Sequence, residues 1–599
     1  MADHDGTPPE MLATLESWRL VADELEWSTP YETLFRASPP YDDWFVGGEL
    51  NLSVNCIDRH LAGRGDCVAA FWEGEPGDRR ELTYRELHSE VIRLTAAMRG
   101  MGVRCGDRVA LHLGWLPETV VAMLSCARLG AEFTVIPVVL PVEALALRLD
   151  DFRPRILFTQ DGGWRHGAIL PLKARADEAL EAASGVQHTV VVRRTGVQVN
   201  WFEGDRWFDE VLAAGNPDQG HPEPLPAARP IAAVHLANRR GRPVAVRLGT
   251  ANLAVAALAT HRFGVADGEV FWAAADGSWL AAQAHGVFGP LLAGASTVMY
   301  EGTLDVPDPA RAWQIVERYQ VTSLMTSPSI MRALRGWSLT APGGTASLRR
   351  VTSIGERLDP ELRTWLATVL GDDVTVADAW GQLELGGIVA CDIPIDGDRL
   401  PDPMFAIFDE GGTPVPVGVA GEWVMLHPWA GLMRAVDVRG EDPTAYHWTR
   451  HPGHYATGDL ARRNESGEVE FLGRLDEVVS VSGQLVSLNE VRDALIDQPF
   501  VADAEVFERS DARLGRSVAA AVVLPPDAPS DAATLRELQD GVRELLGGLS
   551  RPRALLVVDR FGEELDAPAR RRALAVLAAA MQSDPVHVTW EQVLAAAGQ

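Results

Sequence analysis

From about Leu82 onward, amphipathic helical runs alternate with short apolar segments, and this alternation is what most limits the fold of the chain. The spacing predicts a helix over Thr83–Met101, a strand over Asp107–Leu113 and a helix over Glu118–Leu129. Further strands are expected in apolar segments at Arg155–Thr159, His188–Val192, Ala232–Leu236 and Ser296–Tyr300. Because helix-length segments separate several of them, we predict an α/β fold with largely parallel sheets.

The pattern of predicted elements changes after residue 411. A strand-rich and turn-rich stretch follows, and a final α/β segment begins at Leu472. We therefore predict an N-terminal domain over residues 1–473, a hinge at 474–476 and a small C-terminal domain over 477–599. Near the end of the chain, helices are expected over Arg570–Met581 and Pro585–Ala597.

Composition excludes several functional classes. The 599 residues are long enough for several domains at about 150 residues each. A net charge of −29 argues against nucleic acid or an anionic membrane as partner, because both require clustered cations. The amino terminus has no apolar signal segment, and no stretch approaches about 18 consecutive apolar residues. We expect a cytoplasmic protein.

The cysteine, histidine and lysine residues limit which metal-binding and catalytic chemistry the chain could perform. The cysteines have no CxxC spacing, and we interpret all five as reduced core residues: Cys56, Cys67, Cys105, Cys126 and Cys391. Isolated histidines at 261, 285 and 451 are interpreted as packed or surface residues. Lys173 is the single lysine among 54 lysine and arginine residues, so lysine-dependent chemistry has one candidate. Arginine does not replace a compact ammonium where geometry matters.

Several segments together strongly resemble the acetyl-CoA synthetases of the AMP-forming acyl-CoA synthetase and adenylating-enzyme superfamily. They are Trp44–Leu61, Phe71–Asp78, Asp161–Arg165, Gly289–Gly302, Tyr455–Asp459 and Gly473–Asp476. The resemblance covers essentially the whole chain. It implies a large N-terminal domain and a small mobile C-terminal domain that swings about a hinge at Asp476. It also implies ATP, AMP, Mg²⁺ and CoA as ligands: a carboxylate and ATP give an acyl-adenylate, and CoA then displaces AMP.

The segment that corresponds to the family's phosphate-binding loop differs from the family sequence in this chain. In place of a sequence like T-S-G-S-T-G-K-P-K-G, residues 236–245 lack every hydroxyl and two of three glycines. Glycine lets backbone N–H groups approach phosphate, which larger residues hinder. Arg239, Arg240 and Arg242 are candidate phosphate contacts in their place. The segment is therefore either an altered phosphate site or a solvated basic turn.

The catalytic C-terminal lysine of the family is also missing. In the family it lies in a motif like R-S-G-K, and a gap-free register places Pro568 at that position. Proline donates no hydrogen bond. Lys173 matches a family-like Pro-Leu-Lys segment of the large domain and does not take its place. Loss of a charged transition-state contact costs several kcal/mol, about 3 to 4 by analogy with oxyanion-hole donors.

Residues 378–387 match the family pattern W-W-Q-T-E-T-G-G in part. Gln382 and Glu384 are retained, and the resemblance makes Glu384 the carboxylate near Mg²⁺. Leu383 replaces a threonine whose hydroxyl contacts the α-phosphate. Gly381 replaces the tryptophan that walls the acetate pocket, so any bound acyl group should be larger than acetate.

Other nucleotide-facing positions persist. The adenosine contacts implied by the resemblance are Gly355, Glu356, Arg357, Trp380, Gln382, Asp459 and Arg474. In family terms Asp459 accepts the ribose hydroxyls and Arg474 is its partner. An equally open interpretation is that these segments are retained as interdomain structure. On the CoA side Arg165 matches one phosphate contact, but Ala168 and Leu485 replace basic residues.

These patterns lead to two hypotheses. The first is a degenerate acetyl-CoA synthetase-like pseudoenzyme, in which adenylation is lost or weakened and a binding or regulatory role, with a nucleotide or a protein partner, is retained. The second is a divergent AMP-forming acyl-CoA ligase that activates a carboxylate larger than acetate through an acyl-adenylate. In the second case the arginines of residues 239–242 would replace the usual phosphate contacts.

Overall fold

The computed structural model describes residues 9–38, 40–236, 244–262, 269–337, 344–392, 403–436, 446–475, 478–482, 484–525, 528–562, 565, 567–580 and 586–597. The predictions on Arg239, Arg240, Arg242 and Asp476 lie outside these residues.

One large sheet confirms the predicted parallel organisation. Its strand order is β13–β12–β9–β7–β8–β15–β16–β25. The bounds are β7 (Arg108–Leu111), β8 (Glu132–Val135), β9 (Ile156–Gln160), β12 (His188–Val192), β13 (Asp205–Trp207), β15 (Pro230–Leu236), β16 (Val244–Gly249) and β25 (Ala435–Val436). The strands from β13 to β15 in this order run parallel, whereas β16 and β25 join antiparallel.

Another large sheet has the order β22–β21–β20–β19–β17–β18–β5–β6. Its strands are β5 (Val68–Gly74), β6 (Arg79–Thr83), β17 (Val270–Ala273), β18 (Ser296–Glu301), β19 (Ser323–Thr326), β20 (Arg350–Ser353), β21 (Thr375–Gln382) and β22 (Gly387–Cys391). The central strands are parallel, and β6 and β22 close the edges in antiparallel pairing. The carboxyl ends of β20 and β21 therefore lie at one edge, where ligands bind in open α/β sheets.

The helices form where capping and burial favour them. Helix α4 (Tyr84–Gly100) begins at Thr83, whose hydroxyl accepts from the Glu86 amide while the Glu86 carboxylate accepts from the Thr83 amide. Helix α5 (Pro117–Leu129) is buried on every face and ends at Gly130, whose φ is 76°. Further helices of the large part are α1 (Pro9–Asp23), α6 (Val142–Phe152), α7 (Leu172–Ala182), α8 (Phe208–Ala214), α9 (Thr250–Arg262), α11 (Gly289–Ala293), α12 (Arg311–Tyr319), α13 (Pro328–Trp337) and α14 (Pro360–Leu370).

A smaller antiparallel sheet carries the Tyr455–Asp459 segment. Its strands, in order, are β23 (Phe405–Phe408), β24 (Ala420–Met425), β26 (Tyr455–Arg463) and β27 (Val469–Arg474). Asp459 on β26 and Arg474 on β27 are direct partners in the register. The strand-rich segment expected after residue 411 is confirmed.

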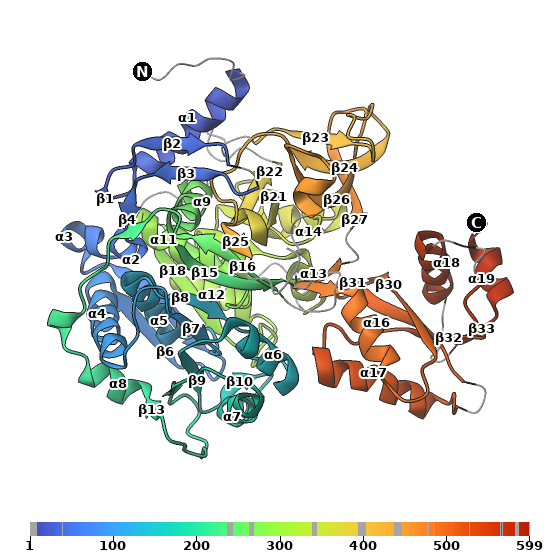
Figure 1. Cartoon of the computed structure of the whole chain (residues 1–599), viewed down its shortest axis with the longest axis horizontal. Coiled ribbons are helices and arrows are strands. Elements are labelled where there is room, and N and C mark those ends of the chain that lie inside the picture. Colours follow the sequence, from blue (N-terminus) through green and yellow to red (C-terminus); the bar gives the residue numbers. More distant parts are fainter. Residues whose placement is uncertain are drawn as a thin grey trace.

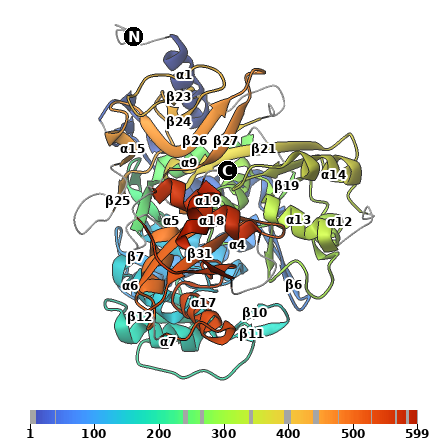
Figure 2. The same cartoon turned by 90° about the vertical axis from the view of Figure 1, so that its right-hand side faces the viewer.

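The C-terminal elements form a small α/β domain beside the large part (Figures 1 and 2). They are the hairpin β28 (Val478–Val481) and β29 (Gln484–Ser487), the strands β30 (Asp503–Asp511), β31 (Gly515–Val523), β32 (Leu555–Val558) and β33 (Val586–Val588), and the helices α16 (Leu488–Ile496), α17 (Ala532–Leu546), α18 (Ala567–Ala579) and α19 (Trp590–Ala597). Buried residues of this part make hydrophobic clusters of their own.

Two sequence-based expectations need correction. The helix predicted over Pro585–Ala597 begins only at Trp590, because the valines of Val586–Val588 pair in parallel with β32. The cysteines are not all core residues, since Cys67 and Cys105 are exposed and Cys391 is half-buried. Within the part of the chain that the structure describes, no helix has both the length and the apolar character needed to cross a membrane.

Candidate functional site

The strand end of β21 and the centre of β26 meet around the Asp459 carboxylate. Trp380 Nε1 donates to Asp459 Oδ2 at 2.9 Å, and Gln382 Nε2 reaches the same oxygen at 3.3 Å. Arg474 Nη1 donates to Oδ1 at 3.1 Å. Asp459 is 7% exposed, so these donors offset the cost of burying its charge. The structure therefore brings four of the adenosine-facing candidates into direct contact.

Further residues hold this cluster in place, and two of them, Tyr455 and Thr457, belong to the Tyr455–Asp459 segment. Tyr455 Oη donates to Gln382 Oε1 at 3.0 Å, and the Thr457 hydroxyl accepts from the Asp459 amide at 3.0 Å. The turn before Asp459 is fixed by Glu422, which accepts from the Gly458 amide at 3.0 Å. Glu422 was not part of any motif, because it reaches Gly458, 36 positions away, only through the pairing of β24 with β26.

His451, interpreted from sequence as isolated, pairs with the buried Glu422 carboxylate. Its Nε2 lies 3.0 Å from Glu422 Oε2, and the ring packs edge-on against Phe408. His261 and His285 are buried as well. The interpretation as packed residues is confirmed for all three, although His451 also orients the turn that carries Asp459.

Glu384 lies immediately after β21, in the short 3₁₀ turn Leu383–Leu385. It is 5% exposed, and its Oε1 lies 3.6 Å from Nε2 of His447, which comes from the short helix α15 (Tyr446–Thr449). Burial alone would raise the pKa of Glu384. The interaction with His447, together with the charge of Arg474, outweighs burial and lowers the pKa below its usual value. Glu384 is thus an ionised carboxylate that already faces a histidine.

Glu384 offers Mg²⁺ a single carboxylate, next to an imidazole. Mg²⁺ takes oxygen ligands in a near-octahedral arrangement. In the described ranges no group of three or more histidine, cysteine, aspartate or glutamate side chains is placed to share a metal ion. Because Mg²⁺ at nucleotide sites is usually held by one or two carboxylates together with substrate phosphates and waters, the role of Glu384 as a magnesium ligand stays a prediction.

The segment expected to face adenine lies just beyond β20, and its three residues have different neighbours. Gly355 has a φ of 97°, which favours glycine, and its carbonyl accepts from the Ser480 hydroxyl of the C-terminal domain at 2.9 Å. Glu356 pairs with Arg332 at 2.5 Å. Arg357 points toward Glu470 on β27, 3.6 Å away. Ser480 and Gly515 of the C-terminal domain thus lie close to the first two residues, although Gly355 itself stays exposed.

We predict that Gly515→Val loosens the C-terminal domain. Gly515, at the start of β31, has a φ of 76°, and a Cβ there would lie 2.1 Å from Arg332 Nη2 and 2.2 Å from Glu356 Oε2. Left-handed strain of about 1–2 kcal/mol would destabilise the turn itself, and the new side chain would oppose docking by displacing the Arg332–Glu356 pair. Small-angle scattering should show a larger radius of gyration. Gly467→Val, at a φ of 90° with open space around it, is the matched control and should leave the radius unchanged.

Gly381 has a structural explanation. A Cβ at this position would lie 2.0 Å from the Gly387 carbonyl oxygen, because β21 and β22 shift register between Trp380 and Gly381. The backbone of β22 therefore fills the space where a side chain would begin. The geometry gives no opening for a larger acyl group in that direction.

The remaining candidates lie elsewhere. Pro568 is in the first turn of α18, where the neighbouring Arg570 and Arg571 both bind Glu505 within the C-terminal domain, each at 2.6 Å. These arginines therefore do not reach Glu384 or Asp459. Arg165 is half-buried at the end of β10 (Gly163–Arg165), in a hairpin with β11 (Ala168–Leu170).

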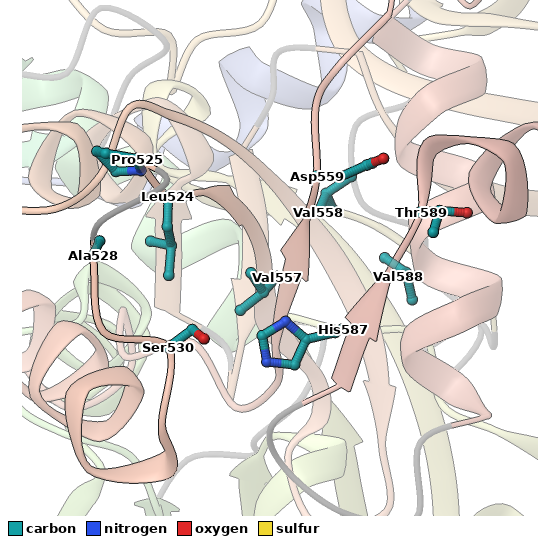
Figure 3. A pocket seen from close by; sticks show the side chains of 10 residues that line it. All are labelled: Leu524, Pro525, Ala528, Ser530, Val557, Val558, Asp559, His587, Val588 and Thr589. Carbon is teal, nitrogen blue, oxygen red and sulfur yellow. The ribbon is translucent and has the colours of Figure 1, made fainter.

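A cavity of about 320 Å³ opens at the carboxyl ends of β31, β32 and β33 (Figure 3). Apolar side chains, among them Leu524 and Val557, line it together with His587, Ser530 and Thr589. His587 is the register partner of Val557 on the neighbouring strand. None of the adenosine-facing candidates lines this cavity, so it is separate from the Asp459 cluster.

Comparison with known proteins agrees with this arrangement. The chain matches the model of the AMP-binding enzyme family over residues 57–435, that of the acetyl-coenzyme A synthetase N-terminus over 16–56 and that of the AMP-binding enzyme C-terminal domain over 490–563.

Relatives cover nearly the whole chain. Acetyl-coenzyme A synthetase of Streptomyces coelicolor is 36% identical, over 93% of this chain and 88% of its own length. The enzyme of Mycobacterium tuberculosis is 37% identical over 96% and 93%. That of Pyrobaculum aerophilum is 36% identical over 95% and 89%. The chain therefore belongs to the AMP-binding enzyme family, as an acetyl-CoA synthetase-like member.

Proposed function

We propose that this chain binds an adenine nucleotide of low charge, such as AMP, and does not carry out ATP-dependent adenylation at the rate of an acetyl-CoA synthetase. Its role is then binding or regulation. The family implies ATP or AMP, CoA and a small carboxylate as ligands. The proposal assigns only the AMP-like part of that set to this chain.

The Asp459 cluster is the observation that carries the proposal. Trp380, Gln382 and Arg474 hold both oxygens of this carboxylate in fixed positions. A carboxylate has about four lone-pair sites and is a strong acceptor for neighbouring hydroxyls, as in a ribose. The adenosine side of the site is thus assembled from residues that the family resemblance also names.

On the phosphate side, two positions of the described chain lack the donors that the family resemblance implies, whereas Arg239, Arg240 and Arg242 lie outside the described residues. Leu383 offers no hydroxyl, and Pro568 offers no ammonium. Arg570 and Arg571 are committed to Glu505. Because adenylation depends on stabilising charge that develops on phosphate, each missing donor is expected to lower the rate by about 10²–10³-fold. For the alternative, a ligase for a larger carboxylate, Gly381 opens no space toward β22, because a Cβ there would lie 2.0 Å from the Gly387 carbonyl oxygen.

Calorimetric titration with AMP, with ATP·Mg²⁺ and with CoA, each alone, tests the proposal. We expect AMP binding at micromolar strength, and no release of pyrophosphate from ATP in the presence of acetate or longer carboxylates. The acetyl-CoA synthetase of Streptomyces coelicolor serves as the active control. Asp459→Ala should weaken AMP binding about 10- to 100-fold, since a hydrogen bond to a charged group contributes about 1.5–3 kcal/mol.

Two results would contradict the proposal. Pyrophosphate release within tenfold of the control enzyme would show that adenylation survives. An AMP affinity that is the same in the wild type and in Asp459→Ala would show that the nucleotide does not use this cluster.

A further inference from the structure

We infer that Trp380 and Gln382 saturate one oxygen of the Asp459 carboxylate, so that this residue accepts at most one hydroxyl of a ribose. The ligand class then includes 2′-deoxy or 3′-deoxy nucleotides, because one of the two sugar hydroxyls is dispensable. The inference deepens the proposed function and rests on it for the identity of the nucleotide. The saturation of the carboxylate oxygen stands on the contacts described below.

The side-chain amide of Gln382 is fixed on all sides. Its Nε2 donates to the Thr457 carbonyl oxygen at 2.8 Å and to Asp459 Oδ2 at 3.3 Å, which uses both of its N–H groups. Its Oε1 accepts from the Tyr455 hydroxyl at 3.0 Å. Because a carbonyl oxygen only accepts, the amide cannot turn over without losing the bond to Thr457. Gln382 therefore keeps one acceptor site of Oδ2 occupied.

The indole of Trp380 takes the second acceptor site of the same oxygen. Its Nε1 donates to Asp459 Oδ2 at 2.9 Å, and an indole has this one donor. The ring lies parallel to Phe471 on β27, with an interplanar angle of 1° and centroids 6.2 Å apart. It also meets Phe405 on β23 edge-on, at 5.5 Å. Two aromatic neighbours from the small sheet thus hold the indole nitrogen against Asp459.

The number of acceptor sites then limits what a ligand finds at Asp459. A carboxylate has about four such sites, about two on each oxygen. Trp380 and Gln382 fill those of Oδ2, and Arg474 Nη1 already donates to Oδ1 at 3.1 Å. A second ribose hydroxyl would have to displace the indole N–H, which would lose this hydrogen bond. Asp459 can therefore bind one hydroxyl at most, and only through Oδ1.

Calorimetric titration of the wild type with AMP, 2′-deoxy-AMP and 3′-deoxy-AMP compares the two hydroxyls. We expect at least one of the deoxy nucleotides to bind with an affinity within about twofold of that of AMP. If Asp459 bound both hydroxyls, each deoxy nucleotide would lose a hydrogen bond to a charged group and bind about 10- to 100-fold more weakly. Such a loss with both analogues would overturn the inference.

Trp380→Phe provides the complementary test, because it removes the indole donor and keeps an aromatic ring against Phe471. An acceptor site on Oδ2 becomes available, so we expect the variant to prefer AMP over the tolerated deoxy nucleotide by about tenfold. An unchanged preference would contradict the role of Trp380.

Trp423→Phe is the matched control. Trp423 belongs to the same aromatic group and stacks on Phe405 at 4.5 Å, but its Nε1 has no hydrogen-bond partner among the residues that the structure describes. This variant should keep the wild-type ratio of the two affinities.

The indole signal of Trp380 separates this inference from the proposed function. In a ¹H–¹⁵N spectrum it is the tryptophan side-chain signal that is missing from Trp380→Phe. We expect its proton to shift upfield in Asp459→Ala without any nucleotide, because the indole N–H loses its acceptor. An unchanged shift would overturn the inference and leave AMP binding intact. Absence of AMP binding would contradict the proposed function, and the indole signal would still decide whether Trp380 occupies Asp459.

Discussion

Replacing Glu73 by alanine is expected to lower the free energy of unfolding of the large domain by about 3–5 kcal/mol, the usual cost of breaking a buried ion pair from one side. Glu73, at the end of β5, is fully buried. It binds Arg311 at 2.8 Å and Arg318 at 2.6 Å, and it accepts from the Tyr319 hydroxyl at 2.9 Å. Without Glu73, Arg311 keeps its charge at 6% side-chain exposure.

Urea unfolding followed by tryptophan fluorescence measures this loss. Arg79→Ala is the matched control, because Arg79 binds the same carboxylate at 3.1 Å but its side chain is 48% exposed. Exposed ion pairs contribute about 0–1 kcal/mol. Equal losses in the two variants would mean that burial does not set the strength of this network.

Replacing the single lysine is the second change with a large expected effect. Lys173 on α7 has no exposed surface, and its Nζ lies 2.5 Å from Asp177 and 2.8 Å from Asp205. Burial raises the pKa of Asp177, and Lys173 opposes that rise. Lys173→Met removes the cation between these two carboxylates, so we expect a loss of about 3–5 kcal/mol in unfolding free energy.

The same variant separates a structural role from a catalytic one. AMP affinity should stay within twofold of the wild type at temperatures where the variant is folded. Arg193→Met, nearby on the surface with a side chain 49% exposed, should cost less than about 1 kcal/mol. A Lys173→Met protein with normal stability but no AMP binding would make Lys173 part of the site.

Local features of the fold followed directly from the sequence. The helix expected over Thr83–Met101 is α4, and the strand expected over His188–Val192 is β12 with identical bounds. Apolar periodicity and capping residues specify such elements, because the groups involved are neighbours in the chain. The error at Pro585–Ala597 arose because pairing with β32 outweighed helix-like spacing in a short segment.

Only part of the candidate site could be predicted from the sequence. Motif similarity identified Trp380, Gln382, Asp459 and Arg474, and the structure places all four in contact. It did not identify His447, which lies in a short helix without a recognisable motif. Nor did similarity explain Gly381, because the close approach of the Gly387 carbonyl depends on a register shift between two strands.

The sequence by itself determined the α/β class and the family. These properties depend on residue identity and on spacing over a few residues. Only the tertiary structure decided that Lys173 is a buried counter-ion, that His447 faces Glu384 and that Gly515 docks on the Arg332–Glu356 pair. Each of the last two contacts joins residues more than sixty positions apart. Lys173 on α7 pairs with Asp205 on β13, which follows later in the chain. Such contacts exist only when strand register and domain docking are fixed together.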